Sequence, residues 1–153
     1  IVCLTSKNKQ ASGLINFIGN NSKTIAIDFD GTVVDDAYPK VGKPKLFAIE
    51  TLKKLQQDGH RLILWTYRSG SQLDDAVAFC KSKGINFYAV NRSFPEDEFD
   101  NTKSRKIHAD LFIDDRNIGG FMGWGEVYQR LSNPNYSPKN LNKKKGFFSF
   151  FKK

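Results

Sequence analysis

Four short apolar runs constrain the fold of this 153-residue chain more than any other feature. They cover residues 25–29, 61–66, 86–90 and 111–113. Both faces of each run are apolar, and roughly 20 residues or more separate one run from the next. Parallel strands need such long crossover connections, whereas antiparallel strands can be joined by tight turns. The spacing therefore predicts a mainly parallel sheet.

Helical periodicity fills the first two gaps between these runs. Apolar residues recur at helical spacing after Pro44, a candidate helix start, and before Gly59. A second periodic segment lies between Ser71, a candidate N-cap, and Gly84. We expect one helix in each gap.

The third gap, 91–108, is polar and contains a proline, so we expect a loop with a short helix over 102–108. A last helix is expected over 125–131. The alternation of strands and helices predicts the α/β class, as a Rossmann-like three-layer sandwich with helices on both faces of the sheet.

The positive charge is concentrated at the two ends of the chain. The net charge is +8, but residues 1–23 and 139–153 hold nine lysines and no acids, which leaves 15 basic and 16 acidic residues in 24–138. This distribution argues against a nucleic-acid groove across the body of the protein. We expect an N-terminal extension over 1–23, one α/β domain over 24–132, and a linker with a basic and aromatic tail over 133–153.

The tail leaves two interpretations open. Its clustered phenylalanines and lysines are typical either of a solvated chain end or of a segment that docks on a membrane surface or a protein partner. Cys3 and Cys80 lack metal-type spacing, which favours reduced thiols and a cytoplasmic location. No apolar stretch approaches the ~20 residues of a membrane span.

Two carboxylates end the first apolar run. Residues 24–32 read TIAIDFDGT, so Asp28 and Asp30 lie at the exposed end of a strand and Gly31 lets the chain turn away. Two such carboxylates repel each other unless a cation lies between them. Mg²⁺ prefers oxygen ligands, and a phosphoryl group brings further oxygens to the metal. This segment therefore indicates a magnesium site for phosphoryl chemistry.

The other strands also end at polar residues. Thr66 ends the second run, and the fourth delivers Asp114 and Asp115. Ligands in open α/β sheets bind beyond these strand ends. Each feature alone has a structural explanation, since threonine is common in strands and an acidic pair can cap a helix.

Together these residues resemble the haloacid dehalogenase (HAD) superfamily of phosphohydrolases. The family has an Asp-x-Asp-Gly-Thr motif at the first strand, a Thr or Ser at the second, a lysine, and an acidic pair at a later strand. Alternatives are the metal grip of a sugar-nucleotide transferase, which leaves Thr66 and the acidic pair unexplained, and a calcium loop, whose ligand pattern Thr32 and Val33 break.

The resemblance implies roles for the site residues. Asp28 would be the nucleophile that forms an aspartyl-phosphate, and Asp30 would protonate the leaving oxygen and then activate water. Mg²⁺ would be held by Asp28, Asp30 through its backbone carbonyl, Asp114 and Asp115. Thr66 would donate a hydrogen bond to the phosphoryl group, and Lys106, or less favourably Lys103, would offset its charge. The expected phosphate-binding set is Phe29, Gly31, Thr32, Thr66, Tyr67, Arg68 and Lys106.

The spacing leaves no room for a cap domain. Residues 33–43 suffice only for a flap, so the chain resembles a minimal, capless member with an open site. Such a site suits a phosphate on a large molecule, or a small substrate enclosed by a second subunit of a homo-oligomer. The alternative to a phosphomonoesterase is a catalytically silent phosphate-binding or scaffold protein on the same fold, tethered by its tail; transfer to an acceptor other than water is a weaker variant.

Overall fold

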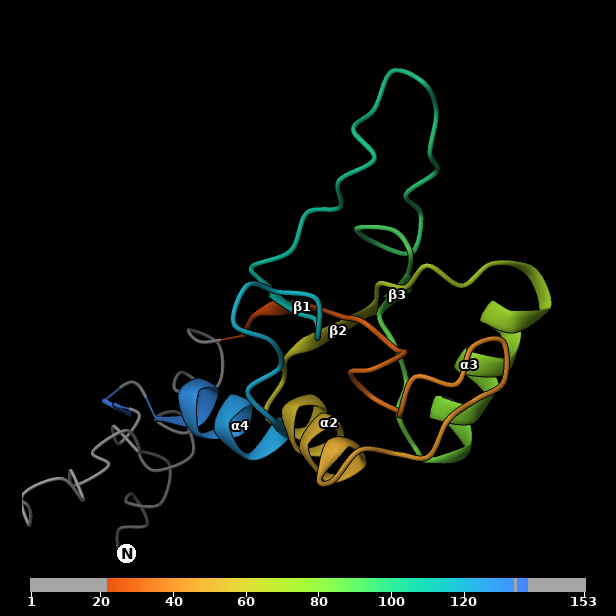
Figure 1. The fold of residues 1–153 in the computed structure, drawn as a ribbon. Helices are drawn as coiled ribbons and strands as arrows, with labels where there is room; N and C mark the ends of the chain where they lie inside the picture. The colour runs from red at the N-terminus through yellow and green to blue at the C-terminus, as the bar shows by residue number, and fades with distance from the viewer. Residues whose placement is uncertain (1–21, 134, 138–153) are drawn as a thin grey trace, which may run out of the picture.

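The computed structural model describes residues 22–133 and 135–137. Its elements follow the order β1 (Thr24–Ile27), α2 (Ala48–Gln57), β2 (Arg61–Leu64), α3 (Gly70–Ser82), β3 (Ala89–Val90), β4 (Leu111–Ile113) and α4 (Trp124–Ser132). The strands form one parallel sheet of order β3-β2-β1-β4, in which Ile27 pairs with both Leu64 and Ile113 (Figure 1). The predicted α/β class and Rossmann-like parallel sheet are confirmed.

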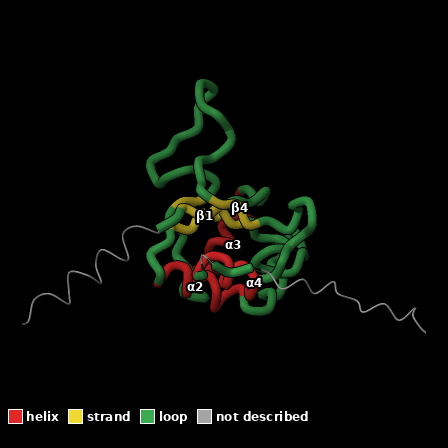
Figure 2. The backbone as a smooth tube through the Cα atoms, turned by 90° about the vertical axis from the view of Figure 1, so that its left-hand side faces the viewer, coloured by secondary structure: helices red, strands yellow, loops and turns green. Residues whose placement is uncertain are grey.

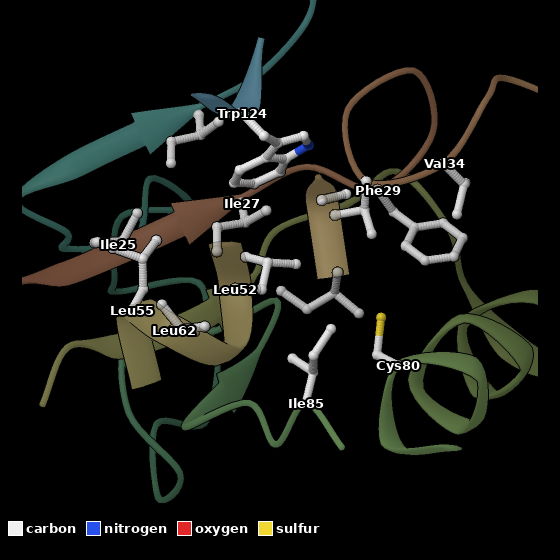
Figure 3. Packing of buried hydrophobic residues seen from close by; sticks show 14 of the residues in the cluster. Ile25, Ile27, Phe29, Val34, Leu52, Leu55, Leu62, Cys80, Ile85 and Trp124 are labelled. Atoms are coloured by element: carbon white, nitrogen blue, oxygen red, sulfur yellow. The ribbon is translucent and has the colours of Figure 1, made fainter. Parts of the chain in front are cut away.

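The three helices of the described region lie on one face of the sheet (Figure 2). Side chains of β1, β2 and β4 that point to this face pack against α2, α3 and α4, as Ile27, Leu52 and Trp124 illustrate (Figure 3). The other face carries a smaller cluster of four buried residues: Ala26, Ile63, Ala89 and Ile107. Residues 91–110 cover it as a long loop that rises above the sheet in both views.

The strand order explains this asymmetry. The connections β1-α2-β2 and β2-α3-β3 step in the same direction, so right-handed crossovers place both helices on one face. The step from β3 back to β4 runs in the opposite direction, which places its connection on the other face. That connection is a loop, so the prediction of helices on both faces is wrong for the described residues, where a loop forms the third layer.

Several predicted boundaries shift. β1 and β2 end before Asp28 and Trp65, and β3 is shorter than the expected run over 86–90. The first helix begins at Ala48 rather than near Pro44, because Pro44 forms a β-bridge with Val34. The second begins at Gly70, so its N-cap is Ser69 and not Ser71.

The short helix expected over 102–108 is absent from this described segment, which is an irregular loop with a turn at its start. Asp100 explains this in part, since its carboxylate accepts a hydrogen bond from the Thr102 backbone N–H at 2.7 Å and so competes with helical bonding. The last helix, expected over 125–131, is confirmed as α4.

The described segments that could hold a cap, 33–43 and 91–110, contain no helix. Among the described residues, no helix is both long and apolar enough to cross a membrane. The tail over 139–153, the linker's larger part and the expected extension up to residue 21 lie outside the described residues.

Candidate functional site

Backbone hydrogen bonds align the carboxyl ends of the strands. The Asp28 N–H donates to the Ile113 carbonyl at 3.0 Å, and the Trp65 N–H donates to the Ile27 carbonyl at 2.8 Å. The ladder therefore continues one residue past the end of β1 and one residue past the end of β2. It brings the residues that follow β1, β2 and β4 to one edge of the sheet.

Three carboxylates meet at this edge. One carboxylate oxygen from each of Asp28, Asp114 and Asp115 lies within 4.8 Å of the others. The expectation that residues 28 and 114 converge, although far apart in the sequence, is confirmed. The side chain of Asp30 does not join this group.

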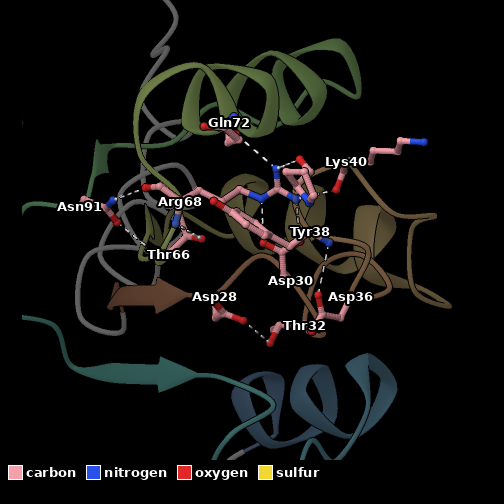
Figure 4. Close-up of polar contacts among 11 residues, drawn as sticks. Asp28, Asp30, Thr32, Asp36, Tyr38, Lys40, Thr66, Arg68, Gln72 and Asn91 are labelled. Atoms are coloured by element: carbon pink, nitrogen blue, oxygen red, sulfur yellow. Dashed lines mark hydrogen bonds and ion pairs between the residues drawn. The ribbon is translucent and has the colours of Figure 1, made fainter.

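Thr32 orients two of these acids. Its hydroxyl donates to Asp28 Oδ2 at 3.0 Å (Figure 4). The same hydroxyl oxygen accepts the backbone N–H of Asp115 at 3.0 Å. The residue is fully buried, and its own carbonyl accepts a hydrogen bond from Trp124 Nε1 at 2.9 Å. Thr32 therefore links the first acidic motif to the second and to α4, which makes it a positioning residue rather than an open phosphate contact.

The electrostatics of Asp28 are those of a crowded carboxylate. The pKa of Asp28 is raised from 3.8 to about 6, chiefly by burial and to a smaller extent by the negative charges of Asp114 and Asp115. Hydrogen bonds from the Phe29 backbone and the Thr32 hydroxyl oppose this rise. A cation among the three carboxylates would remove this repulsion.

Two features of the cluster fit a bound divalent cation. Asp115 Oδ1 is buried and has no hydrogen-bond partner in the described part of the chain, so one ligand oxygen is unsatisfied. Gly31 has a φ of +84°, and a Cβ at this position would collide with the Asp115 carboxylate. Only glycine lets the acid sit this close to the first motif. An all-carboxylate donor set suits a hard ion such as Mg²⁺.

Asp30 is held away from the cluster by Arg68. The Arg68 Nε and Nη2 atoms donate to the two Asp30 carboxylate oxygens, each at 2.7 Å (Figure 4). The guanidinium also donates to the carbonyls of Pro39 and Lys40 at 2.9 and 2.7 Å. The Arg68 side chain is fully buried, and the Asp30 hydrogen bonds raise its pKa above its usual value. Arg68 was expected as a phosphate contact, whereas it is an internal clamp.

The other predicted phosphate-binding residues divide into two groups. Thr66 lies at the site, where its N–H donates to Asn91 Oδ1 at 2.8 Å and its hydroxyl oxygen accepts the Arg68 N–H at 3.3 Å. Tyr67 is 95% exposed at the same edge. Phe29 is instead a core residue, packed edge-to-face against Phe79, and does not line the cavity at the strand ends.

The structure does not bring the two candidate lysines to the site. Lys106 is exposed and does not line the cavity at the strand ends. Lys103 lines a separate cavity on the loop side of the sheet, where its ammonium lies 3.9 Å from Asp97. Arg105, between them in sequence, does line the site.

The site is a cavity of about 870 Å³ at the carboxyl edge of the sheet. Its lining residues are Asp28, Asp30, Asp36, Tyr38, Trp65, Thr66, Tyr67, Arg68, Ser69, Asn91, Phe99, Arg105, Asp114 and Arg116. The predicted site set lacks eight of these, namely Asp36, Tyr38, Trp65, Ser69, Asn91, Phe99, Arg105 and Arg116. A signal exists for residues next to a predicted strand end, such as Trp65 beside Thr66 and Arg116 after the acidic pair. Asp36, Tyr38, Phe99 and Arg105 lie in loops whose paths the sequence does not reveal.

Fold and site together define the class: a Rossmann-like α/β protein with a carboxylate cluster beyond its parallel strands. No family model and no curated protein matches the chain. A solved structure of a conserved protein from Bacteroides thetaiotaomicron is similar, with 50% sequence identity, a TM-score of 0.71, and coverage of 76% of this chain and 94% of the Bacteroides chain. The chain belongs to the same family as this conserved Bacteroides protein.

Proposed function

We propose that this protein is a magnesium-dependent phosphohydrolase of the haloacid dehalogenase type, which cleaves phosphate monoesters through an aspartyl-phosphate. The observation that carries the proposal is the convergence of Asp28, Asp114 and Asp115 within 4.8 Å at the edge of the sheet. Thr66 and Asp30 line the same cavity. A carboxylate cluster of this kind, open to a cavity, suits a metal-assisted attack on phosphorus.

The metal would be held by the carboxylates of Asp28, Asp114 and Asp115, the last through its unsatisfied Oδ1. When bound, Mg²⁺ supplies positive charge that offsets the phosphoryl oxygens and the three acids. The chain itself orients the nucleophile, because the Thr32 hydroxyl fixes Asp28 Oδ2 and leaves the other carboxylate oxygen free to attack.

In the first step, an Asp28 oxygen forms a bond to phosphorus while the bond from phosphorus to the ester oxygen breaks. Asp30 gives its proton to that departing oxygen. In the second step, water attacks phosphorus, Asp30 takes the water proton, and the bond to Asp28 breaks to release phosphate. Thr66 would donate a hydrogen bond to a phosphoryl oxygen throughout.

Arginine takes the place of the expected lysine in this proposal. Arg105 and Arg116 both line the cavity, whereas the guanidinium of Arg68 is engaged by Asp30. A guanidinium can bind two phosphate oxygens at once, so either residue can offset the substrate charge.

One observation favours a second candidate, a phosphate-binding protein without turnover. Both Asp30 oxygens accept hydrogen bonds from the buried Arg68, which is the arrangement of a charged carboxylate. Asp30 can act as an acid only if this pair opens or receives a proton when substrate binds. A protein in which the pair never opens would bind phosphate esters and leave them intact.

The test is phosphate release from a panel of monoesters at pH 7 with and without Mg²⁺. We expect release that needs Mg²⁺ and that falls by about 10³-fold or more in Asp28→Asn, because the nucleophile is lost. Asp74→Asn, an exposed aspartate on α3, is the matched control and should keep full activity. Activity that survives Asp28→Asn contradicts the mechanism, and binding without release favours the second candidate.

The proposal also covers the cellular location and the partners of the protein. Cys80 is buried and forms no disulfide within the described residues, which supports a reducing, cytoplasmic location. The expected partners are a phosphorylated substrate, small or macromolecular, and a second copy of the chain in a homo-oligomer.

A further inference from the structure

Four aromatic residues line the cavity that Asp28 and Asp114 also line. We call Tyr38, Trp65, Tyr67 and Phe99 the aromatic rim. We propose that the leaving group of the substrate carries a flat aromatic ring that stacks on this rim. The inference rests on the proposed phosphohydrolase function and names its substrate class: aromatic phosphate esters, with nucleoside monophosphates and aryl phosphates as the two sources of that chemistry.

The size of the cavity is the first argument. Its volume of about 870 Å³ falls in the range of roughly 300–1,000 Å³ typical of sites for drug-sized ligands. A phosphoryl group and one metal ion fill only the part of it beside Asp28 and Asp114. The rest of the cavity is therefore available to the leaving group.

The exposure of the rim is the second argument. Tyr67 is 95% exposed, Tyr38 54% and Phe99 53%. The rings come from three separate segments: the loop after β1, the end of β2, and the long loop 91–110. Large aromatic side chains gathered at one cavity mouth from distant parts of the chain are typical of a binding site rather than of scattered surface residues.

The polar groups of the cavity point to the same ligand. Asn91, Thr66 and Arg68 are largely engaged with one another and with Asp30. Outside the carboxylate cluster and the two arginines proposed for the phosphate, this leaves Asp36 and Ser69 as the non-aromatic polar residues of the lining. The guanidinium of Arg105 lies 4.6 Å from the centre of the Phe99 ring, and that of Arg68 lies 5.4 Å from the Tyr38 ring. The rim thus already holds stacked planar groups, and it offers a further planar group more contact than it offers a polyol.

The first experiment compares esters that share a phosphate and differ in the ring. Adenosine 5′-monophosphate and phosphotyrosine carry a ring; ribose 5-phosphate and phosphoserine do not. We expect kcat/KM to be about tenfold or more higher for at least one ring-bearing ester than for its ringless counterpart. Preference for the nucleotide or for phosphotyrosine identifies the source of the ring.

Variants of the long loop make the test specific. Phe99→Ala and Phe99→Leu should remove most of the preference, the second with a smaller loss of apolar volume. Phe94→Ala is the matched control, because Phe94 lies on the same loop with a similar exposure of 45% but lines the other cavity. Equal kcat/KM for both kinds of ester, or a preference that Phe99→Ala leaves intact, would overturn the ring inference while the phosphohydrolase proposal stands.

A binding measurement separates the two proposals. Of the two tryptophans, Trp65 lines the cavity and Trp124 is buried, at 1% exposed. In Asp28→Asn with Mg²⁺, we expect adenosine monophosphate or phosphotyrosine to quench the tryptophan fluorescence, and ribose 5-phosphate to leave it unchanged. The additional substitution Trp65→Phe should abolish this quenching. Such quenching without any turnover by the wild-type protein would support the ring site and refute the phosphohydrolase; no quenching and no turnover would refute both.

Discussion

Thr32 and Gly31 show how single residues prepare the carboxylate cluster. Thr32 uses one hydroxyl to bind both Asp28 and the backbone of Asp115, and Gly31 supplies the space that the Asp115 carboxylate occupies. Both residues are therefore required for the geometry of the carboxylate cluster, even though neither needs to contact a substrate. This arrangement lowers the stability of the metal-free protein, because it holds together acids that repel each other in the absence of a cation.

At this scale, we expect Asp28→Asn to stabilise the metal-free protein at high pH. The pKa of Asp28 is raised to about 6 in the folded state, so the folded protein binds this proton more tightly than the unfolded chain. The free energy of unfolding therefore falls as pH rises from about 4 to about 6, and it stays lowered above that window. Asp28→Asn should not show this decrease, because asparagine does not titrate. Asparagine retains an oxygen that can accept the Thr32 hydrogen bond.

The measurement is urea denaturation of both proteins in EDTA. The variant should be more stable by about 1 kcal/mol at pH 8, once solvent screening of this partly exposed group is counted, and nearly equal to the wild type at pH 4. A variant that is less stable at pH 8 would contradict the assigned burial and crowding of Asp28.

At the scale of elements, Arg68 joins three segments. Its guanidinium donates to Asp30 after β1, to the carbonyls of Pro39 and Lys40 in the flap, and to the Gln72 carbonyl at 3.4 Å in α3. The flap is therefore fixed to the first motif through one buried cation. A side chain from the connection between β2 and α3 thus helps to determine how the loop after β1 is arranged.

Loss of this clamp should be strongly destabilising. In Arg68→Met, the Asp30 carboxylate loses its partner, and we expect a loss of about 3–5 kcal/mol in the free energy of unfolding, measured by urea denaturation at pH 7.5. Arg116→Met, an exposed arginine at the same cavity, should change it by less than about 0.5 kcal/mol. Arg68→Met with Asp30→Asn should recover part of the loss; no recovery would show that the pair itself matters little.

At the scale of the whole molecule, the sheet order makes the site. β1 lies between β2 and β4, so Asp28 has Thr66 on one side and Asp114 on the other. Because a ligand at this edge contacts segments 86 residues apart in the sequence, binding should stabilise the entire fold.

Mg²⁺ should therefore raise the melting temperature at pH 7.5. At a concentration 100 times the dissociation constant, the expected stabilisation is about 2.7 kcal/mol, or several degrees. EDTA should reverse the shift, NaCl of equal ionic strength should not reproduce it, and Asp114→Asn should reduce it sharply. A shift of the same size in Asp114→Asn would place the ion elsewhere.

Much of the fold could be predicted because its signals are local. The apolar run 111–113 coincides with β4. Acids directly follow β1 and β4, so a parallel sheet in which these strands are neighbours brings Asp28 and Asp114 to one edge. The side chains of loops could not be predicted in this way. Lys106 and Arg105 are neighbours in sequence, yet only Arg105 lines the cavity, because the path of the long loop decides it.

The sequence by itself determined the parallel α/β class and the carboxylate cluster, since apolar period and strand-end chemistry are properties of short segments. Tertiary structure alone decided that Arg68 clamps Asp30, that Phe99 and Tyr38 join one rim, and that the helices of the described region share a face. These outcomes depend on contacts between distant segments and on crossover direction. No local pattern encodes either, because each is fixed only when the strands are assembled in their final order.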